Sequence, residues 1–369
     1  MQNTERYSRH LNLTGFGLAA QQKLQQAKVL VIGAGGLGCP VLQYLTAAGV
    51  GVIGIADDDV VSLSNLQRQV LYSVDDLGLL KAQQAAERLR RLNPEIIIHA
   101  HLQKVDSSNA LELLEKYDLV VDGTDNFASR YLINDACVLL GKPLVFAAVY
   151  QYEGQLAVFN VPGRGGIKTS YRDLFPTPPK ASEAPDCNAA GVLGVLPGIM
   201  GIMQATEVIK LIAGIGDPLS NQLLTYNALS SESYTIQISP NAQAKAHTPK
   251  DAAEFRQTDY EWLCSPGTRA MPVIDKLTFE QYKSDPSALI LDVREFGEWP
   301  QASFPHLQIP LNSLKGEFRK LEKDKIIVFC QSGKRSAAAA ALLQEHFGDS
   351  KEIYTLAGGI TALENNLYE

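Results

Sequence analysis

Short apolar runs alternate with segments of helical length at the start of the chain. Val29–Ile32 and Val50–Ala56 are apolar and rich in β-branched residues, which is typical of buried strands. Between them, Cys39–Ala48 has the length of a helix, and Gly49 is placed to end it. A strand, a helix and a second strand in this order predict a βαβ unit of a parallel sheet.

The same alternation continues through the first domain. Residues 4–27 predict two short helices joined by a turn. The uncharged stretch 189–206 contains four glycines and Pro197, so we expect a buried helix next to a loop rather than a membrane span. Further helices are expected at 82–92 and 128–140, and further strands at 96–98, 119–122, 143–149 and 155–161.

A second, smaller α/β unit is predicted from residue 272 onward. Leu289–Glu295 and Lys325–Cys330 predict strands, and Ser336–Leu343 predicts a helix. The residues before this unit are rich in Asn, Ala, Lys, Pro and Thr, which is typical of a linker. We therefore expect a first domain at 1–245, a linker at 246–271 and a second domain at 272–369.

Composition and charge narrow the classes of function. The 369 residues are 46% hydrophobic and 20% charged, as in soluble globular proteins. The net charge of −7, without a basic block, argues against nucleic acid as the main partner, and the first residues lack the apolar core of a signal peptide. The five cysteines are widely spaced, so we expect no disulfide framework and a reducing cytoplasmic location. We also expect no membrane partner.

The first predicted strand ends in a glycine-rich turn. The spacing is Gly33-x-Gly35-x-x-Gly38, with Gly36 inside it. Such a turn lets backbone N–H groups approach a phosphate at the start of a helix. The motif therefore predicts a nucleotide site, and the residues that follow must distinguish the nucleotide and the reaction.

Charged residues follow the second strand. Asp57 and Asp59 come directly after it, and Asp57 lies about 20 residues beyond the turn, where a carboxylate holds a ribose hydroxyl. A helix-capping or turn-forming acid is the alternative for Asp57. Asn65 and Arg68 are three residues apart and would share one face of a helical turn, and Lys81 opens the next helix. Converging cations suit phosphates, which gain charge during nucleotidyl transfer.

Asp125 is a candidate metal ligand. It follows the strand 119–122, at the edge where open α/β sheets bind their ligands. A hard carboxylate there can hold Mg²⁺ beside a phosphate while the ion keeps most of its water. The alternative is that Asp125 caps the helix 128–140, and both roles are compatible.

These segments together resemble the E1-like adenylyltransferases of molybdopterin and thiamine synthesis, the MoeB/ThiF (HesA/MoeB/ThiF) family. The resemblance extends over residues 5–240. Within this range, segments 6–9, 64–69 and 123–126 also match the family. It implies a Rossmann-like α/β domain with a mostly parallel sheet. It also implies that ATP and Mg²⁺ are used to adenylate the C-terminal glycine of a small ubiquitin-like sulfur-carrier protein of MoaD/ThiS type that ends in Gly-Gly.

The resemblance also implies roles for individual residues. It implies a homodimer in which Arg9 reaches the nucleotide of the other subunit. Cys187 matches a segment that bears a thiol in members that bond covalently to the carrier, and a thiol before a helix can be nucleophilic. An unreactive loop cysteine is the alternative for Cys187. The resemblance implies that Asp57 binds the ribose of the nucleotide. It implies that Asn65, Arg68 and Lys81 bind the phosphates and that Asp125 binds the metal.

The chain departs from the family at its structural zinc. Many members bind zinc with two Cys-x-x-Cys pairs, but segments 170–173 and 239–242, where the pairs would fall, contain no cysteine. Since a structural zinc needs about four such ligands, we predict no zinc site. Without zinc, we expect the loop 163–184 to be mobile and to cross near the active site.

The second unit carries a cysteine at the end of a strand. Backbone N–H groups of a loop at a helix N-terminus form an anion-binding concavity, which would keep a thiolate or persulfide charged. A buried strand-end cysteine is the alternative. The cysteine and its persulfide loop are Cys330 followed by Gln331, Ser332, Gly333, Lys334 and Arg335.

Segments 292–294, 330–336 and 356–359 resemble a rhodanese domain. Related phosphatases use Cys-x5-Arg, whereas four residues separate Cys330 from Arg335, and the shorter loop favours sulfur over phosphate. Segment 298–303 lacks the histidine of the family, and we attach no catalytic consequence to it.

The two units together predict a sequence of reactions. The carrier carboxylate would be adenylated with help from Arg68, Lys81 and Asp125-bound Mg²⁺, and a Cys330 persulfide would then attack the acyl-adenylate. Cys187 or an external reductant would release the thiocarboxylate, with sulfur supplied by a cysteine desulfurase or thiosulfate. Two alternatives stay open: an NAD-dependent oxidoreductase fused to a sulfurtransferase, and a non-catalytic module that binds a carrier or senses redox state.

Overall fold

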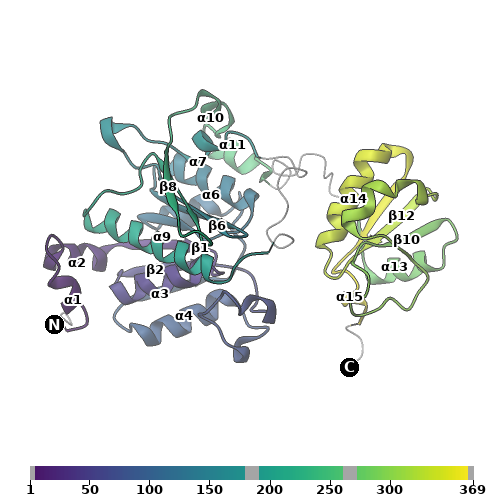
Figure 1. Ribbon diagram of the computed structural model, residues 1–369, viewed down its shortest axis with the longest axis horizontal. Helices are drawn as coiled ribbons and strands as arrows, with labels where there is room; N and C mark the ends of the chain where they lie inside the picture. The colour runs from purple at the N-terminus through teal and green to yellow at the C-terminus, as the bar shows by residue number, and fades with distance from the viewer. Residues whose placement is uncertain (1–4, 179–190, 261–271, 365–369) are drawn as a thin grey trace. The chain divides into compact units, whose positions relative to one another are not determined.

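The chain folds into two compact units, Met1–Cys264 and Ser265–Glu369. They are seen in a computed structural model that describes residues 5–178, 191–260 and 272–364 (Figure 1). Each unit has its own sheet, one of eight strands and one of five. The expected fold class, a mostly parallel α/β domain with a smaller α/β domain, is confirmed.

The larger sheet has the order β3-β2-β1-β4-β5-β6-β7-β8. Strands β3 to β5 pair in parallel, and β6 to β8 extend the sheet with antiparallel pairing. The strands are β1 (Lys28–Ile32), β2 (Val52–Ala56), β3 (Ile97–His101), β4 (Leu119–Asp122), β5 (Leu144–Tyr150), β6 (Glu153–Phe159), β7 (Gln222–Asn227) and β8 (Ser233–Gln237).

Helices cover both faces of this sheet, with α3 and α9 on one face and α6 on the other (Figure 1). Val29 and Val31 of β1 point into one core, and Leu30 and Ile32 point into the other, as strand alternation requires. The helices are α1 (Ser8–Leu11), α2 (Gly17–Gln26), α3 (Gly38–Ala48), α4 (Lys81–Leu92), α5 (Ala110–Glu115), α6 (Phe127–Leu140), α7 (Tyr171–Leu174), α9 (Val195–Ala213), α10 (Ala242–His247) and α11 (Ala252–Gln257).

Helix α9 is long and apolar enough to cross a membrane, judged by length and composition alone. Leu196, Met200, Gln204 and Val208, spaced four residues apart, form a buried stripe along it. The helix packs against α2, α3, β5 and β6, so it serves as a core helix of the first unit.

Parallel pairing aligns the carboxyl ends of three strands. Ile32, the last residue of β1, pairs with Ala56 of β2 and with Asp122 of β4. Gly33, Asp57 and the segment after β4 therefore leave the sheet side by side, at the edge where open α/β sheets bind ligands.

The smaller sheet is parallel throughout, in the order β11-β10-β12-β13-β9. Ile326 and Val328 of β12 enter one core and Ile327 and Phe329 enter the other. The elements are β9 (Val273–Ile274), α13 (Lys276–Lys283), β10 (Ala288–Asp292), β11 (Leu307–Gln308), β12 (Lys325–Phe329), α14 (Lys334–Phe347), β13 (Glu352–Leu356) and α15 (Thr361–Glu364).

Part of the expected linker is folded. Helices α10 and α11 lie at 242–257, and Phe255 and Tyr260 are buried in the core that α6 covers. This segment has the polar composition of a linker, but two aromatic side chains give it enough apolar surface to pack. Residues 261–271 lie outside the described part of the chain.

Candidate functional site

The glycine turn is closed by backbone approach. Gly33 has a φ of +93°, and a Cβ atom placed on it would lie 2.7 Å from the carbonyl oxygen of Gly123. A Cβ atom on Gly38 would lie 1.9 Å from the carbonyl oxygen of Gly33. Both positions therefore require glycine, because β1, the start of α3 and the segment after β4 meet without room for side chains.

Asp57 is bonded to this turn. One carboxylate oxygen accepts the N–H of Ala34 at 2.7 Å, and the other accepts the N–H of Asp59 at 2.9 Å. Burial raises the pKa of Asp57 above its ordinary value. These two contacts show Asp57 in its alternative role, that of a turn-forming acid. Since each carboxylate oxygen can accept a further bond, the ribose role stays a prediction.

Arg68 and Lys81 lie beside the glycine turn, and Asn65 lies in the tight turn that carries Arg68. The carbonyl oxygen of Asn65 accepts the N–H of Arg68 at 3.0 Å, so the two residues share one tight turn. The stem of Arg68 passes Gly36, where a Cβ atom would lie 3.4 Å from Cγ of Arg68. Lys81 is buried, and its Nζ lies 2.9 Å from Oδ2 of the exposed Asp59. The fold therefore brings both cations to the edge that carries the glycine turn.

Asp125 projects from the same edge. Its side chain is exposed, two residues beyond the Gly123 that contacts Gly33. The helix cap is Asn126, whose side chain accepts the N–H of Ser129 at 2.8 Å, so the capping role considered for Asp125 is wrong. An exposed carboxylate with free oxygens fits Mg²⁺, which is commonly held by one or two carboxylates and by water.

Two further candidates from the sequence are Arg9 and Cys187. Arg9 is exposed on α1, at the start of the chain. Cys187 lies outside the described residues. Within the described ranges, no group of three or more His, Cys, Asp and Glu side chains is arranged to hold a metal ion.

The two segments that would bear zinc ligands are joined by a carboxylate. Oδ2 of Asp173 accepts the N–H and hydroxyl of Ser170 at 2.7 and 2.9 Å, and Oδ1 accepts the N–H of Asn241 at 2.7 Å. Asp173 thereby connects segment 170–173 to segment 239–242. This contact could not be predicted from the sequence, because an Asp with a Ser three residues before it is common in loops.

A buried ion pair holds the same region to α6. Nε and Nη2 of Arg172 each donate to Asp135 at 2.7 Å, and the hydroxyl of Tyr260 donates to Asp135 at 3.0 Å. Burial alone would lower the pKa of Arg172, but the bonds to Asp135 outweigh it and raise the pKa. Within the loop 163–184, residues 170–173 are thus anchored to α6 and to segment 239–242, while the mobility of the loop stays a prediction.

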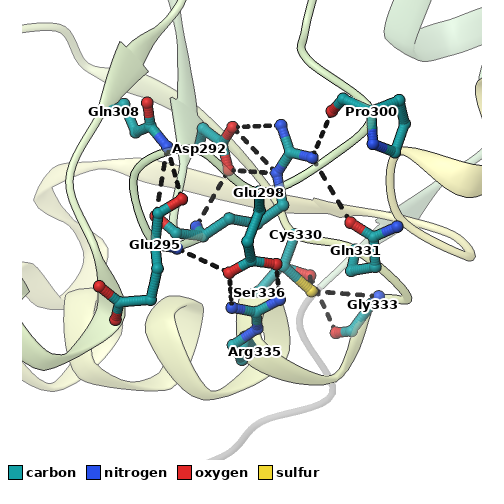
Figure 2. A network of polar contacts seen from close by, with 11 residues as sticks. Asp292, Glu295, Glu298, Pro300, Gln308, Cys330, Gln331, Gly333, Arg335 and Ser336 are labelled. Atoms are coloured by element: carbon teal, nitrogen blue, oxygen red, sulfur yellow. Dashed lines mark hydrogen bonds and ion pairs between the residues drawn. The ribbon is translucent and has the colours of Figure 1, made fainter. Parts of the chain in front are cut away.

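Three cysteines can be compared in the described chain. Burial raises the pKa of Cys39 to about 12 and also raises the pKa of Cys137, which makes both poor nucleophiles. Cys330 directly follows β12, and its Sγ accepts the N–H of Gly333 at 3.2 Å (Figure 2). Gly333 has a φ of +95° and caps α14, so the loop turns the N–H of Gly333 toward the sulfur.

The rest of the loop is held by residues that follow the neighbouring strands β13 and β10. The carbonyl oxygen of Cys330 accepts the N–H of Ile360 at 2.8 Å. Arg294 is buried, donates to both oxygens of Asp292, and also reaches the carbonyl of Pro300 at 2.6 Å and Oε1 of Gln331 at 3.5 Å. The loop is thus held in place before any sulfur donor binds.

Glu298 is a residue that sequence reasoning missed. Its carboxylate forms a two-bond ion pair with Arg335, at 2.5 and 2.6 Å (Figure 2). In the sequence, segment 298–303 stands out only by lacking the histidine of the family, and no sequence pattern connects two residues 37 positions apart. The pairing depends on β10 and β12 being neighbours in the sheet.

Comparison with known proteins agrees with this geometry. The ThiF family model matches residues 7–247, and the rhodanese-like domain model matches residues 276–366. A probable adenylyltransferase/sulfurtransferase MoeZ of Mycobacterium tuberculosis is 42% identical over 369 residues, covering 97% of this chain and 92% of that protein. A sulfur carrier protein adenylyltransferase of Thermus thermophilus is 48% identical over 263 residues, covering 70% of this chain and 96% of that protein.

A solved structure gives the same result for the first unit. The crystal structure of E. coli MccB with MccA-N7isoASN superposes with a TM-score of 0.57 at 26% identity, over 65% of this chain and 73% of that chain. Together the relatives indicate an ATP-using enzyme with adenylyltransferase and sulfurtransferase activities, rather than an oxidoreductase or a non-catalytic module. The chain belongs to the ThiF family and carries a rhodanese-like domain in its C-terminal part.

Proposed function

We propose that this enzyme adenylates the C-terminal glycine of a small ubiquitin-like sulfur carrier and then converts it to a thiocarboxylate with sulfur from Cys330. The observation that carries the proposal is the Cys330 loop, in which Sγ accepts the N–H of Gly333, on the same chain as a ThiF-family nucleotide edge. We assign the adenylation step to the domain 1–245 and the sulfur-transfer step to the domain 272–369. The products belong to a sulfur pathway of molybdopterin or thiamine type.

In the first step, a carboxylate oxygen of the carrier attacks the α-phosphorus of ATP and pyrophosphate leaves. Arg68 and Lys81 stabilise the charge on the phosphates, and Asn65 orients them. Asp57 accepts a ribose hydroxyl with its remaining lone pairs. Asp125 holds Mg²⁺, which neutralises phosphate charge when bound. No protein nucleophile is needed, because positioning and charge stabilisation suffice.

In the second step, the outer sulfur of a Cys330 persulfide attacks the acyl carbon and AMP leaves, which gives an acyl disulfide. The N–H of Gly333 and the start of α14 stabilise the anionic sulfur. Attack by the thiolate of Cys187 on the Cys330 sulfur then releases the thiocarboxylate and leaves a Cys187–Cys330 disulfide. An external thiol in the reducing cytoplasm can perform the same attack, which leaves a mixed disulfide on Cys330, and a second thiol then attacks this disulfide and restores the Cys330 thiol.

The proposed partners follow from these steps. They are a carrier that ends in Gly-Gly and a sulfur donor, either a cysteine desulfurase or thiosulfate. We further propose a homodimer through the first domain, in which the exposed Arg9 reaches the nucleotide of the other subunit.

The intact mass of candidate Gly-Gly carriers tests the proposal. Each carrier is incubated with the enzyme, ATP, Mg²⁺ and either donor, and we expect replacement of one carboxylate oxygen by sulfur. The change should be absent with Cys330→Ala. A carrier that is adenylated but never sulfurated would refute the role of Cys330, and a panel in which no carrier changes would refute the whole proposal.

A further inference from the structure

The loop after Cys330 is flanked by an arginine that is already paired. Nη1 and Nη2 of Arg335 each donate to one oxygen of Glu298 (Figure 2). Oε1 of Glu298 also accepts the N–H of Glu295 at 2.8 Å, which fixes the carboxylate from the backbone side. The hydrogen bonds with Arg335 lower the pKa of Glu298, so the pair is ionised at neutral pH.

The second arginine beside the loop is paired as well. Arg294 donates to both oxygens of Asp292, and both side chains are almost fully buried. Each of the two arginines is therefore matched by one carboxylate. At the sulfur itself, the N–H of Gly333 is a neutral donor. The arrangement suits a singly charged thiolate or persulfide better than it suits a dianion.

Sulfur donors differ in the charge that they bring to such a loop. When the Cys330 thiolate attacks the outer sulfur of thiosulfate, a new S–S bond forms and the old S–S bond breaks, with its electron pair leaving on sulfite. This leaving group carries a sulfonate-type charge, which binds best to a cation with free N–H donors. When the donor is a protein-bound persulfide, the leaving group is a thiolate, and the donor's position is fixed by protein contacts.

We propose that Glu298 determines the choice of sulfur donor. By pairing with both terminal nitrogens of Arg335, it neutralises a cation that a dianionic donor would need, and so directs Cys330 toward a protein-bound persulfide and away from thiosulfate. The inference rests on the proposed role of Cys330 as sulfur acceptor. Glu298 does not touch the sulfur; it is a positioning residue that acts through Arg335.

Glu298→Gln in the full-length enzyme tests the proposal. The kcat/KM for sulfur transfer from thiosulfate to cyanide should rise about 10- to 100-fold, mainly through a lower KM, because hydrogen bonds to a charged group are released for the donor. The rate with a cysteine desulfurase and cysteine should change by less than about threefold. Glu295→Gln is the matched control, since it removes the same charge from an exposed side chain three residues away.

Further arms separate charge from structure. The thiosulfate gain should shrink at high salt, should vanish in Glu298→Gln combined with Arg335→Gln, and should be absent in Glu298→Asp, which keeps the charge. Arg335→Gln alone leaves Glu298 unpaired and should lower thiosulfate use more than it lowers the desulfurase reaction. A purely structural role would move both donors together.

The proposal is overturned if Glu298→Gln changes thiosulfate use no more than Glu295→Gln, or if both donors respond equally. Its failure can be distinguished from that of the proposed function. If sulfur uptake survives in Cys330→Ala, then Cys330 is not the acceptor. If uptake requires Cys330 but the donor preference does not shift, only the role of Glu298 is refuted.

Discussion

The two candidate sites are assembled in opposite ways. The nucleotide edge collects residues from separate segments between Gly33 and Asp125, which meet because β2, β1 and β4 are neighbours with their ends in register. The sulfur loop lies on one continuous stretch from Cys330 to Arg335, between β12 and α14. The first site therefore depends on the topology of a whole sheet. The second has a local backbone geometry but receives its counter-charges from β10 and the segment after it.

The sharpest test of this comparison is Cys330→Ala. Because the two sites lie in separate compact units, formation of the persulfide should be lost completely while carrier-dependent ATP–pyrophosphate exchange stays within about twofold of the wild type. Intact mass reports the persulfide, and radiolabelled pyrophosphate reports the exchange. A large fall in exchange would show that the sites do not work independently.

Lys81→Ala tests whether a change in the first unit leaves the sulfur chemistry of the second unit unchanged. Removal of a buried cation that lies beside the glycine turn should lower ATP–pyrophosphate exchange about 10²- to 10³-fold, as loss of a preorganised charge does elsewhere. Persulfide formation on Cys330 should not change. Lys116→Ala is the control, since Lys116 is exposed in the same unit. Equal effects of the two substitutions would remove Lys81 from the proposed site.

These contrasts also explain what could be predicted from the sequence. The glycine turn and the Cys330 loop are local, so residue spacing alone revealed them, and strand and helix periodicity gave most elements within a few residues. Helix α14, for example, was expected at 336–343 and extends over Lys334–Phe347. Asp57 was found as well, although its visible contacts fix the turn as much as they prepare a ribose site.

Long-range pairs could not be predicted in this way. Asp173 contacts Asn241, and Glu298 contacts Arg335, only because the fold places distant segments side by side. The folded part of the linker was missed for a related reason. A few aromatic residues in a polar segment do not predict packing until the surface that receives them, here the core beside α6, is known.

Substitution of one glycine in each unit compares the two turns through the free energy of unfolding of each unit. Gly38→Ala places a Cβ atom 1.9 Å from the backbone of Gly33 and should destabilise the first unit by about 3 kcal/mol. Gly333→Ala meets no atom closer than 3.7 Å and should cost only the strain of a positive φ, about 1–2 kcal/mol, in the second unit. Hydrogen–deuterium exchange of peptides from each unit measures both. Equal losses would contradict the claim that Gly38 is closed in by backbone while the position of Gly333 leaves room for a Cβ atom.

The smallest expected effect concerns the region without zinc ligands. Asp173→Ala removes two hydrogen bonds from Ser170 and the one from Asn241 that joins segments 170–173 and 239–242, and should lower the free energy of opening this region by about 1–2 kcal/mol. Faster hydrogen–deuterium exchange should be confined to residues 169–176 and 239–247. Asp217→Ala, at an exposed position in the same unit, should have no such effect. If Asp173→Ala left exchange unchanged, the buried Arg172–Asp135 pair would hold the region by itself, and the carboxylate would not be the cross-link that takes the place of a metal.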